Sequence, residues 1–254
     1  MGRIALINNK GGVGKTTTAT HLAEGFVRKG RDALLVDLDA QASASLSLGC
    51  EREDLEPSIA TCLYEEISAE KVIRRPPGSD VDLITGSSRL QNADVRLAGE
   101  LGRERILQEV LKEVDSQYDH VILDCPPSLS LIPINAIVAS DWLVVPVEPH
   151  YLALEGVGSM LDTVESIKKK IGDSARLLGI VVTRADFRAK ATKQAIEMLR
   201  REHGDTIFDT VVRGNVRVSE ASSYGTTVFN HSPNSTGAEA YHKLTKEVLN
   251  RLDQ

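Results

Sequence analysis

The sequence predicts a single-domain, doubly wound α/β fold, in which a mostly parallel sheet carries helices on both faces. Short runs of leucine and β-branched residues, apolar on both faces, alternate with longer segments of helical period. This alternation is typical of strands that are buried between two layers of helices. No linker, repeat or low-complexity tract interrupts the pattern within the 254 residues. We therefore expect residues 1–254 to form one domain.

The expected elements follow from the apolar runs and their spacing. Strands are predicted at residues 4–8, 32–39, 81–85, 120–124, 142–147 and 177–184, with a weaker candidate at 206–212. Helical periodicity is clearest over residues 17–30, 102–117, 157–171 and 191–202, and Gly30 would end the first of these helices. The stretch 51–78 combines mixed charge with a Pro-Pro-Gly turn, so we expect a surface excursion there.

Bulk composition limits the possible classes of protein. Hydrophobic residues make up 41% and charged residues 26%, as in an ordinary globular protein. The formal net charge of −6 argues against a chain that is basic throughout. The three cysteines form no CxxC pair, which favours a reducing compartment, and Cys125 adjoins an apolar run that should bury it. No stretch approaches the roughly 18 apolar residues of a spanning helix, so we expect a cytoplasmic protein without a membrane partner.

The stretch NNKGGVGKTTT, residues 8–18, lies between the first expected strand and the first expected helix. That order predicts a phosphate-binding loop, because glycines let backbone N–H groups converge on an anion at a helix N-terminus. Lys15 would contact the β- and γ-phosphates of ATP, and the Thr16 hydroxyl would ligate Mg²⁺. The predicted ATP-binding residues of the loop are Gly11, Gly12, Val13, Gly14, Lys15, Thr16 and Thr17. Lys10 has no place in the usual pattern.

Carboxylates follow two of the expected strands. Asp37 and Asp39 end one strand in DLDAQ, and Asp124 ends another in LDCPPS. In a parallel sheet, the carboxyl ends of these strands lie beside the glycine loop. Asp124 would hold Mg²⁺ through water, and Asp39 would orient the attacking water or a metal-bound water. A single strand-end aspartate is more often a helix cap, but two beside a phosphate loop favour a metal site.

Several stretches together resemble the ParA-type partition ATPases with a deviant Walker A motif, and more distantly MinD and the nitrogenase iron protein. They are KGGVGKTTT (10–18), DLDAQASAS (37–45), LDCPPSL (123–129), NVRVSEASSYG (215–225) and GAEAYHKLTKEVL (237–249). Two departures are visible. Ala40 stands where the family usually has proline, and Arg213 and Gly214 precede Asn215 where proline and arginine are common.

The resemblance assigns further residues to an ATPase site. It implies that Lys10 reaches across an ATP-held homodimer to the partner's nucleotide, so that Lys10, Lys15 and Asp39 are the catalytic residues. A second cation suits the charge that develops on the transferred phosphate. The adenine would be contacted at the end of the sixth expected strand and in a nearby loop. The residues that this assignment adds to the ATP site are Thr183, Arg184, Arg213 and Asn215.

A local basic stretch suggests what such a switch acts on. Between Arg184 and Arg217, eight basic residues stand against five acidic ones. From charge alone, a solvated helix face is the more common explanation. The resemblance instead implies non-specific DNA contacts from Arg188 and Arg217, and two copies in a dimer would double these contacts.

The sequence thus predicts an ATP- and Mg²⁺-dependent dimerising ATPase that binds DNA non-specifically and positions a cargo. A ParB-like or cargo-adaptor protein would stimulate hydrolysis, and the protein would be cytoplasmic and nucleoid-associated. The main alternative is a MinD-like, membrane-associated positioning ATPase, but the terminal EVLNRLDQ lacks the basic amphipathic character of a membrane helix. An iron–sulfur reductase would need other cysteines, and a small-molecule ligase gives no reason for Lys10, Arg188 and Arg217.

Overall fold

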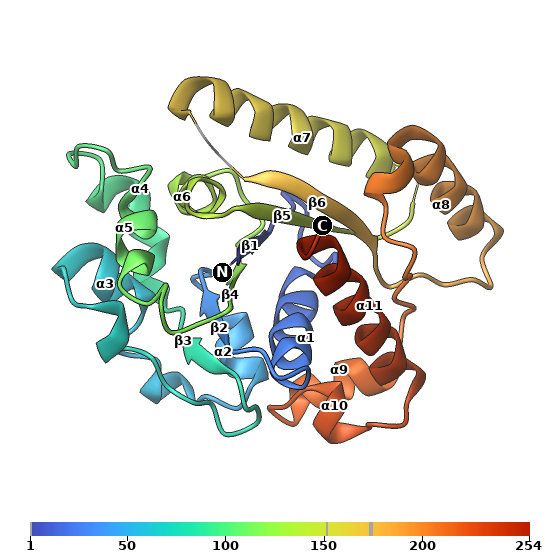
Figure 1. Ribbon diagram of the computed structural model, residues 1–254, viewed down its shortest axis with the longest axis horizontal. Helices are drawn as coiled ribbons and strands as arrows, with labels where there is room; N and C mark the ends of the chain where they lie inside the picture. The colour runs from blue at the N-terminus through green and yellow to red at the C-terminus, as the bar shows by residue number, and fades with distance from the viewer. Residues whose placement is uncertain (1, 151, 173–174) are drawn as a thin grey trace.

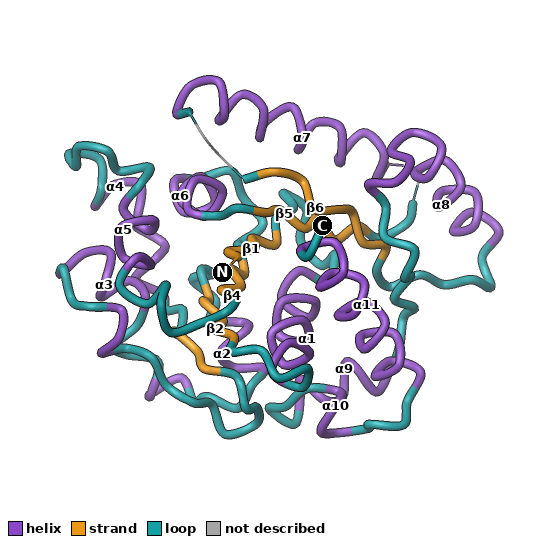
Figure 2. The backbone as a smooth tube through the Cα atoms, viewed as in Figure 1, coloured by secondary structure: helices purple, strands orange, loops and turns teal. Residues whose placement is uncertain are grey.

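Six parallel strands form one sheet in the computed structural model, which describes residues 2–150, 152–172 and 175–254 (Figures 1 and 2). The strands are β1 (Gly2–Leu6), β2 (Ala33–Asp37), β3 (Asp82–Ile84), β4 (His120–Asp124), β5 (Trp142–Val147) and β6 (Arg176–Val182). Their order across the sheet is β3-β2-β4-β1-β5-β6. The central position of β1 places the loop that follows it between the ends of β4 and β5.

Helices cover both faces of this sheet. The α-helices are α1 (Lys15–Val27), α2 (Ser43–Ser47), α3 (Ile59–Glu65), α4 (Ala93–Arg96), α5 (Ile106–Lys112), α6 (Leu131–Ala139), α7 (Leu152–Ile171), α8 (Lys190–His203), α9 (Val216–Ser223), α10 (Val228–His231) and α11 (Thr236–Leu252). Short 3₁₀ turns are η1 (Arg52–Asp54), η2 (Ala69–Lys71), η3 (Ser88–Asn92) and η4 (Gly204–Thr206). Figure 1 shows α1, α9, α10 and α11 together on one side, with α6 and α7 on the other. The predicted doubly wound α/β class is confirmed.

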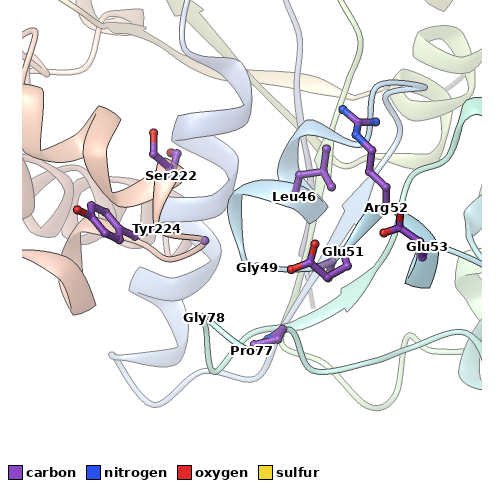
Figure 3. A pocket seen from close by; sticks show the side chains of 12 residues that line it. Leu46, Gly49, Glu51, Arg52, Glu53, Pro77, Gly78, Ser222 and Tyr224 are labelled. Carbon is purple, nitrogen blue, oxygen red and sulfur yellow. The ribbon is translucent and has the colours of Figure 1, made fainter.

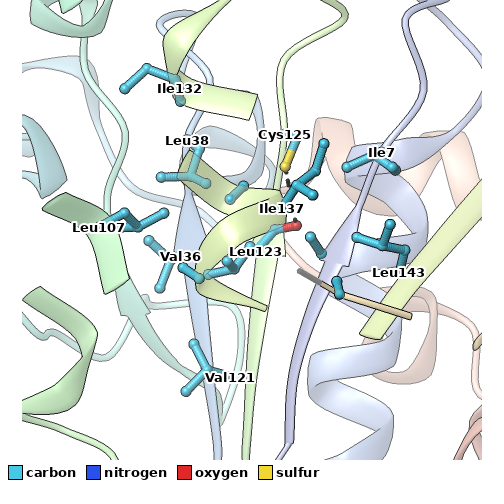
Figure 4. Packing of buried hydrophobic residues seen from close by; sticks show 14 of the residues in the cluster. Ile7, Val36, Leu38, Leu107, Val121, Leu123, Cys125, Ile132, Ile137 and Leu143 are labelled. Atoms are coloured by element: carbon cyan, nitrogen blue, oxygen red, sulfur yellow. Dashed lines mark hydrogen bonds between the residues drawn. The ribbon is translucent and has the colours of Figure 1, made fainter. Parts of the chain in front are cut away.

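The two-residue period of the strands divides the core into two clusters. In β4, Val121 and Leu123 pack in one cluster while Ile122, between them, packs in the other. The first cluster includes apolar residues of α5, α6 and α7, and Figure 4 shows Ile137 of α6 beside Leu123. The second includes residues of α1, α9, α10 and α11. Strands covered on both faces explain the continuous apolar runs of the sequence.

Two of the predicted elements differ in the structure. Residues 206–212 form no strand. Ile207 makes a single parallel bridge to Ile180, and the backbone N–H groups of Asp209 and Thr210 then donate to the carboxylate of Glu247, at 2.7 and 2.9 Å. The N–H groups of Phe208 and Val212 still donate to β6, both at 2.9 Å. The carboxylate on α11 takes the N–H of Thr210 between them, which interrupts the ladder that a seventh strand would need.

The stretch 51–78 is also more than a surface excursion. It contains α3, which buries four residues in the first core cluster, namely Ile59, Ala60, Cys62 and Leu63. The predicted burial of Cys125 is confirmed, since that side chain is 2% exposed.

A buried histidine fixes the helix that follows the glycine loop. Nε2 of His21 accepts a hydrogen bond from the backbone N–H of Val228, at 3.0 Å. Nδ1 therefore carries the proton and donates to the carbonyl oxygen of Thr17, at 2.6 Å. Complete burial lowers the pKa of His21 to about 4, because the imidazolium would lose its hydration. The neutral ring thus joins α1 to α10.

His21 should make the protein lose stability in mild acid. Its folded-state pKa lies below the unfolded value, so the unfolded chain binds more protons between about pH 6.5 and 4. This one group should remove on the order of 3 kcal/mol from the free energy of unfolding as the pH falls through that window. Urea unfolding of wild type and His21→Gln at several pH values measures it. The variant should be less stable at pH 7 by about 1–3 kcal/mol, and the difference should shrink toward pH 4. A constant difference would contradict the assignment.

Candidate nucleotide-binding site

The glycine loop has a backbone shape that only glycine adopts easily. Gly12 and Gly14 have φ values of 77° and 81°, and Gly14 directly precedes the first residue of α1. Asn8 fixes the start of the loop. Its side-chain amide donates to the carbonyl of Pro146 in β5, at 2.8 Å, and its carbonyl oxygen accepts the N–H of Lys10, at 2.9 Å. Asparagine at the entrance therefore ties the loop to the neighbouring strand.

Two residues that follow β6 hold the middle of the loop, at Gly12 and Val13. The hydroxyl of Thr183 donates to the carbonyl oxygen of Val13, at 2.7 Å. The guanidinium of Arg184 donates to the carbonyl oxygen of Gly12, at 2.7 Å, and Arg184 itself has a left-handed φ of 52°. The family resemblance predicts that both residues contact the adenine, and this stays a prediction. Their contacts with the loop were missed because the partners lie about 170 positions away in the chain.

A cavity of about 680 Å³ opens above the loop. Most of the predicted ATP and metal residues line it, namely Gly11, Gly12, Gly14, Lys15, Thr16, Thr17, Asp39, Thr183, Arg184, Arg213 and Asn215. The cavity is also lined by residues that no sequence motif assigned to the site, namely Ser43, Ser47, Ser219, Ser222 and Tyr241. A volume of this size fits an organic ligand such as a nucleotide.

Lys15 lies inside the site as a buried cation. Lys15 is only 6% exposed as a whole residue. Its Nζ donates a hydrogen bond to the carbonyl oxygen of Lys10, at 3.0 Å. Burial lowers the pKa of Lys15, and the nearby carboxylates of Asp124 and Asp39 oppose that shift. An ammonium that has lost much of its hydration can interact strongly with phosphate oxygens.

A pair of buried carboxylates closes the inner end of the site. Asp37 and Asp124 face each other in the register of β2 and β4, and both are fully buried. Asp37 accepts hydrogen bonds from the hydroxyl and N–H of Ser45, at 2.7 and 2.9 Å, and from the N–H of Asp39. Burial and mutual repulsion raise the pKa of Asp124 well above its usual value, and burial also raises that of Asp37.

Asp124 is the member of this pair with unmet bonding capacity. Within the described ranges, neither of its carboxylate oxygens has a hydrogen bond of ordinary length and angle, although the Thr16 hydroxyl lies near enough to favour the ionised form. Buried polar atoms without a partner suggest a ligand or water that completes them. Oxygen donors from a carboxylate and the Thr16 hydroxyl suit Mg²⁺, which keeps several waters and binds phosphates at the same time. The residues present therefore fit a magnesium–nucleotide ligand.

Lys10 points away from this interior. It is exposed, and its Nζ contacts Nε2 of His150, which follows β5. It is not among the described residues that line the cavity. The two lysines of one loop thus have different positions, with Lys15 inside and Lys10 at the surface.

The loop before α9 forms the far wall of the cavity. The guanidinium of Arg213 lies 4.6 Å from the ring centre of Phe187. Asn215 is the N-cap of α9 and accepts the backbone N–H of Arg217, at 2.9 Å. Asn215, the first residue of the stretch NVRVSEASSYG, therefore caps the helix that this stretch forms.

A neighbouring hollow of about 730 Å³ shares Ser222 with the nucleotide cavity and lies between α2 and the end of α9 (Figure 3). Its base is a close approach of three glycines. A Cβ on Gly78 would lie 1.8 Å from the carbonyl oxygen of Gly225, and one on Gly225 would lie 2.8 Å from Cα of Gly49. These contacts hold α9 against α2 and explain the glycine at the end of the 215–225 stretch.

The two arginines predicted to bind DNA lie outside the cavity. The Arg188 side chain is 92% exposed and pairs with Asp186, at 2.8 Å. Hydrogen bonds from the Arg188 guanidinium and N–H lower the pKa of Asp186 to about 2. Arg217 pairs with Glu220, also at 2.8 Å. Each arginine is therefore accessible, and each is already engaged by an acid on its own chain.

Fold and site together define a P-loop nucleotide-binding protein: strand, glycine loop, buried lysine and strand-end carboxylates in a parallel sheet. Residues 1–177 match a family model described as an AAA domain. The chain is 39% identical over 249 residues to the sporulation initiation inhibitor protein Soj of Bacillus subtilis, covering 98% of each. It is 42% identical over 253 residues to the chromosome-partitioning ATPase Soj of Thermus thermophilus, covering 99% of this chain and 97% of that one.

Among solved structures, the chain is similar to cobyrinic acid a,c-diamide synthase from Mycobacterium smegmatis with bound ADP and magnesium. The identity is 27% and the TM-score 0.86, covering all of this chain and 96% of the other. From the sequence matches, this chain belongs to the ParA/MinD-type partition ATPases. It is a nucleotide-hydrolysing P-loop enzyme of the partition or positioning type. None of its helices in the described ranges is long and apolar enough to cross a membrane.

Loss of the contacts from the end of β6 should loosen the glycine loop. Arg184→Ala removes a charge-assisted hydrogen bond to Gly12, and Thr183→Val removes a neutral one to Val13. Each should weaken ATP binding by about tenfold, which corresponds to roughly 1.4 kcal/mol. Titration with a fluorescent ATP analogue measures this. Arg176→Ala, at the opposite end of the same strand, is the matched control and should bind like wild type. Unchanged affinity in both site variants would refute the clamping role.

Proposed function

We propose that this protein is an ATP-gated switch: ATP and Mg²⁺ drive formation of a homodimer, the dimer binds DNA without sequence preference, and hydrolysis releases it. The observation that supports this most directly is the division of the loop's two lysines, one within the cavity and one exposed at the surface. The name of the Thermus thermophilus relative, chromosome-partitioning ATPase, agrees with a role in DNA segregation.

In this proposal the residues of the cavity have distinct tasks. Backbone N–H groups of residues 11–17 and the Lys15 ammonium bind the phosphates. Thr16, with Asp124 and Asp39 acting through water, would hold Mg²⁺, which neutralises charge on the phosphate oxygens. Asp39 is half-exposed at the cavity wall, where it can orient the attacking water. Arg213 and Asn215, on the wall before α9, are proposed to contact the base together with Thr183 and Arg184.

Lys10 is proposed to reach the nucleotide of a second copy. Its exposed side chain contacts His150 at the surface, so it is available to an anion that approaches from outside. Triphosphate would supply that anion and separate the two like charges of the loop. The backbone carbonyl of Lys10, which accepts Lys15, is independent of the Lys10 side chain. Dimerisation and nucleotide binding can therefore be tested separately.

Lys10→Ala should abolish dimerisation and leave monomeric nucleotide binding nearly intact. Light scattering with a non-hydrolysable ATP analogue and magnesium should show a doubled mass for wild type and an unchanged mass for the variant. Affinity for the analogue should fall by no more than about threefold, because Lys15 and its carbonyl partner remain. Lys29→Ala removes another exposed lysine and should dimerise normally. If wild type itself stays monomeric, the proposal fails; if Lys10→Ala dimerises, the trans role of Lys10 fails.

DNA is proposed to bind when its phosphate groups replace the acidic residues that now pair with Arg188 and Arg217. Ion pairs between exposed side chains contribute little stability, so phosphate groups can replace Asp186 and Glu220 at small cost. Two copies in a dimer would double the number of phosphate contacts and make binding depend on ATP. Such contacts release counterions, so affinity should fall steeply with salt.

Two pairs of variants should move DNA affinity in opposite directions. Arg188→Glu and Arg217→Glu should lose retention of a DNA duplex while the ATP-held dimer persists. Asp186→Asn and Glu220→Gln release the arginines from their pairs and should bind several-fold more tightly at low salt. Gel shifts with the ATP analogue at increasing salt measure this, with Arg103→Glu as a control on an exposed, ion-paired arginine between α4 and α5. Equal retention by all variants would remove Arg188 and Arg217 from the DNA role. Sedimentation with liposomes, without retention of DNA, would favour the membrane-associated alternative.

A ParB-like or cargo-adaptor protein is proposed to stimulate hydrolysis, and the protein is proposed to be cytoplasmic and associated with the nucleoid. Residues 1–254 are proposed to act as one domain, since the described helices of both layers pack on one sheet.

A further inference from the structure

A separate groove lies between α3, α4 and α5, the helices that Figure 1 shows together at one end of the molecule. Its volume is about 480 Å³, and in the described part of the chain it has no lining residue in common with the nucleotide cavity. Nothing in the proposed ATP, dimer or DNA roles uses it. A groove of this size outside the chemical site raises the question of what it binds.

The floor of the groove is apolar and only partly covered. Tyr64 and Ile67, in and after α3, and Ile106 and Val110 of α5 are half-buried, although all four pack against the first core cluster. Such residues expose apolar surface to a ligand without loss of the core contacts beneath them.

More apolar surface lies next to this floor. Val95 of α4 is 78% exposed, and Leu101, in the turn after α4, is fully exposed. Both are sequence neighbours of Arg96 and Glu100, which line the groove. Neither of them lines the groove itself, but they add exposed apolar surface to the same segment, as is common near protein-binding surfaces.

The rim of the groove is acidic. Four glutamates line it, Glu66, Glu100, Glu109 and Glu113, against one arginine, Arg96. Lys112 pairs with Glu109 at 2.7 Å, and Glu113 accepts the backbone N–H of Ala69 at 3.0 Å. The excess of carboxylates remains after these contacts. The guanidinium of Arg96 lies 5.0 Å from the ring centre of Tyr64, so this floor already accepts a cation over its aromatic face.

We propose that this groove docks a basic, amphipathic helical segment of another protein. Apolar side chains spaced one helical turn apart would cover Ile67, Ile106 and Val110, and flanking lysines or arginines would face the glutamates of the rim. An acidic segment would be repelled by the same rim. The site is independent of the proposed dimer and DNA surfaces, and it gives a cargo or regulatory partner a place to bind away from the nucleotide.

A designed peptide tests the groove without knowledge of the natural partner. The probe is a synthetic helix of leucine and lysine with leucines at helical spacing, and its counterpart replaces each lysine by glutamate. In methyl NMR spectra of the full chain, the lysine peptide should shift the signals of Ile67, Ile106 and Val110. The glutamate peptide should leave them in place. Shifts confined to other methyl groups would overturn the proposal.

Charge-reversal variants separate this groove from the general acidity of the protein. Glu100→Lys combined with Glu109→Lys should weaken binding of the lysine peptide by at least about tenfold. Asp162→Lys combined with Glu165→Lys, on exposed positions of α7, changes the net charge equally and should keep the affinity within about twofold. An equal loss in both variants would mean non-specific attraction and would refute the site. Titration with the ATP analogue, expected to match wild type in both, shows that each variant is folded.

Discussion

Buried charge at one edge of the sheet is the constraint on which this structure depends. Asp37 and Asp124 end adjacent strands, and Lys15 begins the helix after β1, so three ionisable groups meet where water has little access. Burial opposes the charged form of each of them. Ser45 and the N–H of Asp39 satisfy Asp37, whereas in the described residues Asp124 has only the nearby Thr16 hydroxyl and no hydrogen bond of ordinary geometry. The arrangement is incomplete by itself, and a magnesium–nucleotide ligand would complete it.

The shape of the glycine loop is a second consequence of the sheet order. Its own glycines permit the conformation, but Asn8 ties its start to β5, and the pair Thr183 and Arg184, which follow β6, hold its middle. A phosphate-binding loop gains affinity when its donors are in place before the ligand arrives. These polar clamps supply that preorganisation. Thr183 and Arg184 use loop carbonyl oxygens and Asn8 uses the N–H of Lys10, so none of them takes an N–H of residues 11–17.

Residues proposed to act outside the cavity share a different property. Lys10, Arg188 and Arg217 are exposed, and each contacts a polar group of its own chain. Exposed contacts of this kind are weak and exchangeable. A phosphate from another molecule can therefore displace them, which suits a surface that binds and releases. The groove between α3, α4 and α5 combines a partly exposed apolar floor with an acidic rim, so its recognition would combine hydrophobic contact with charge.

Local patterns in the sequence determined the parallel sheet, the glycine loop and the strand-end carboxylates, because apolar period, glycine sterics and helix start signals act over a few residues. The stretch 206–212 has a strand-like pattern, yet Glu247 on a distant helix takes two of its N–H donors. The clamp from Arg184 to Gly12, the exposed setting of Lys10 and the unpartnered oxygens of Asp124 depend on the order of strands across the sheet. That order brings together groups far apart in the chain, which only the tertiary structure decides.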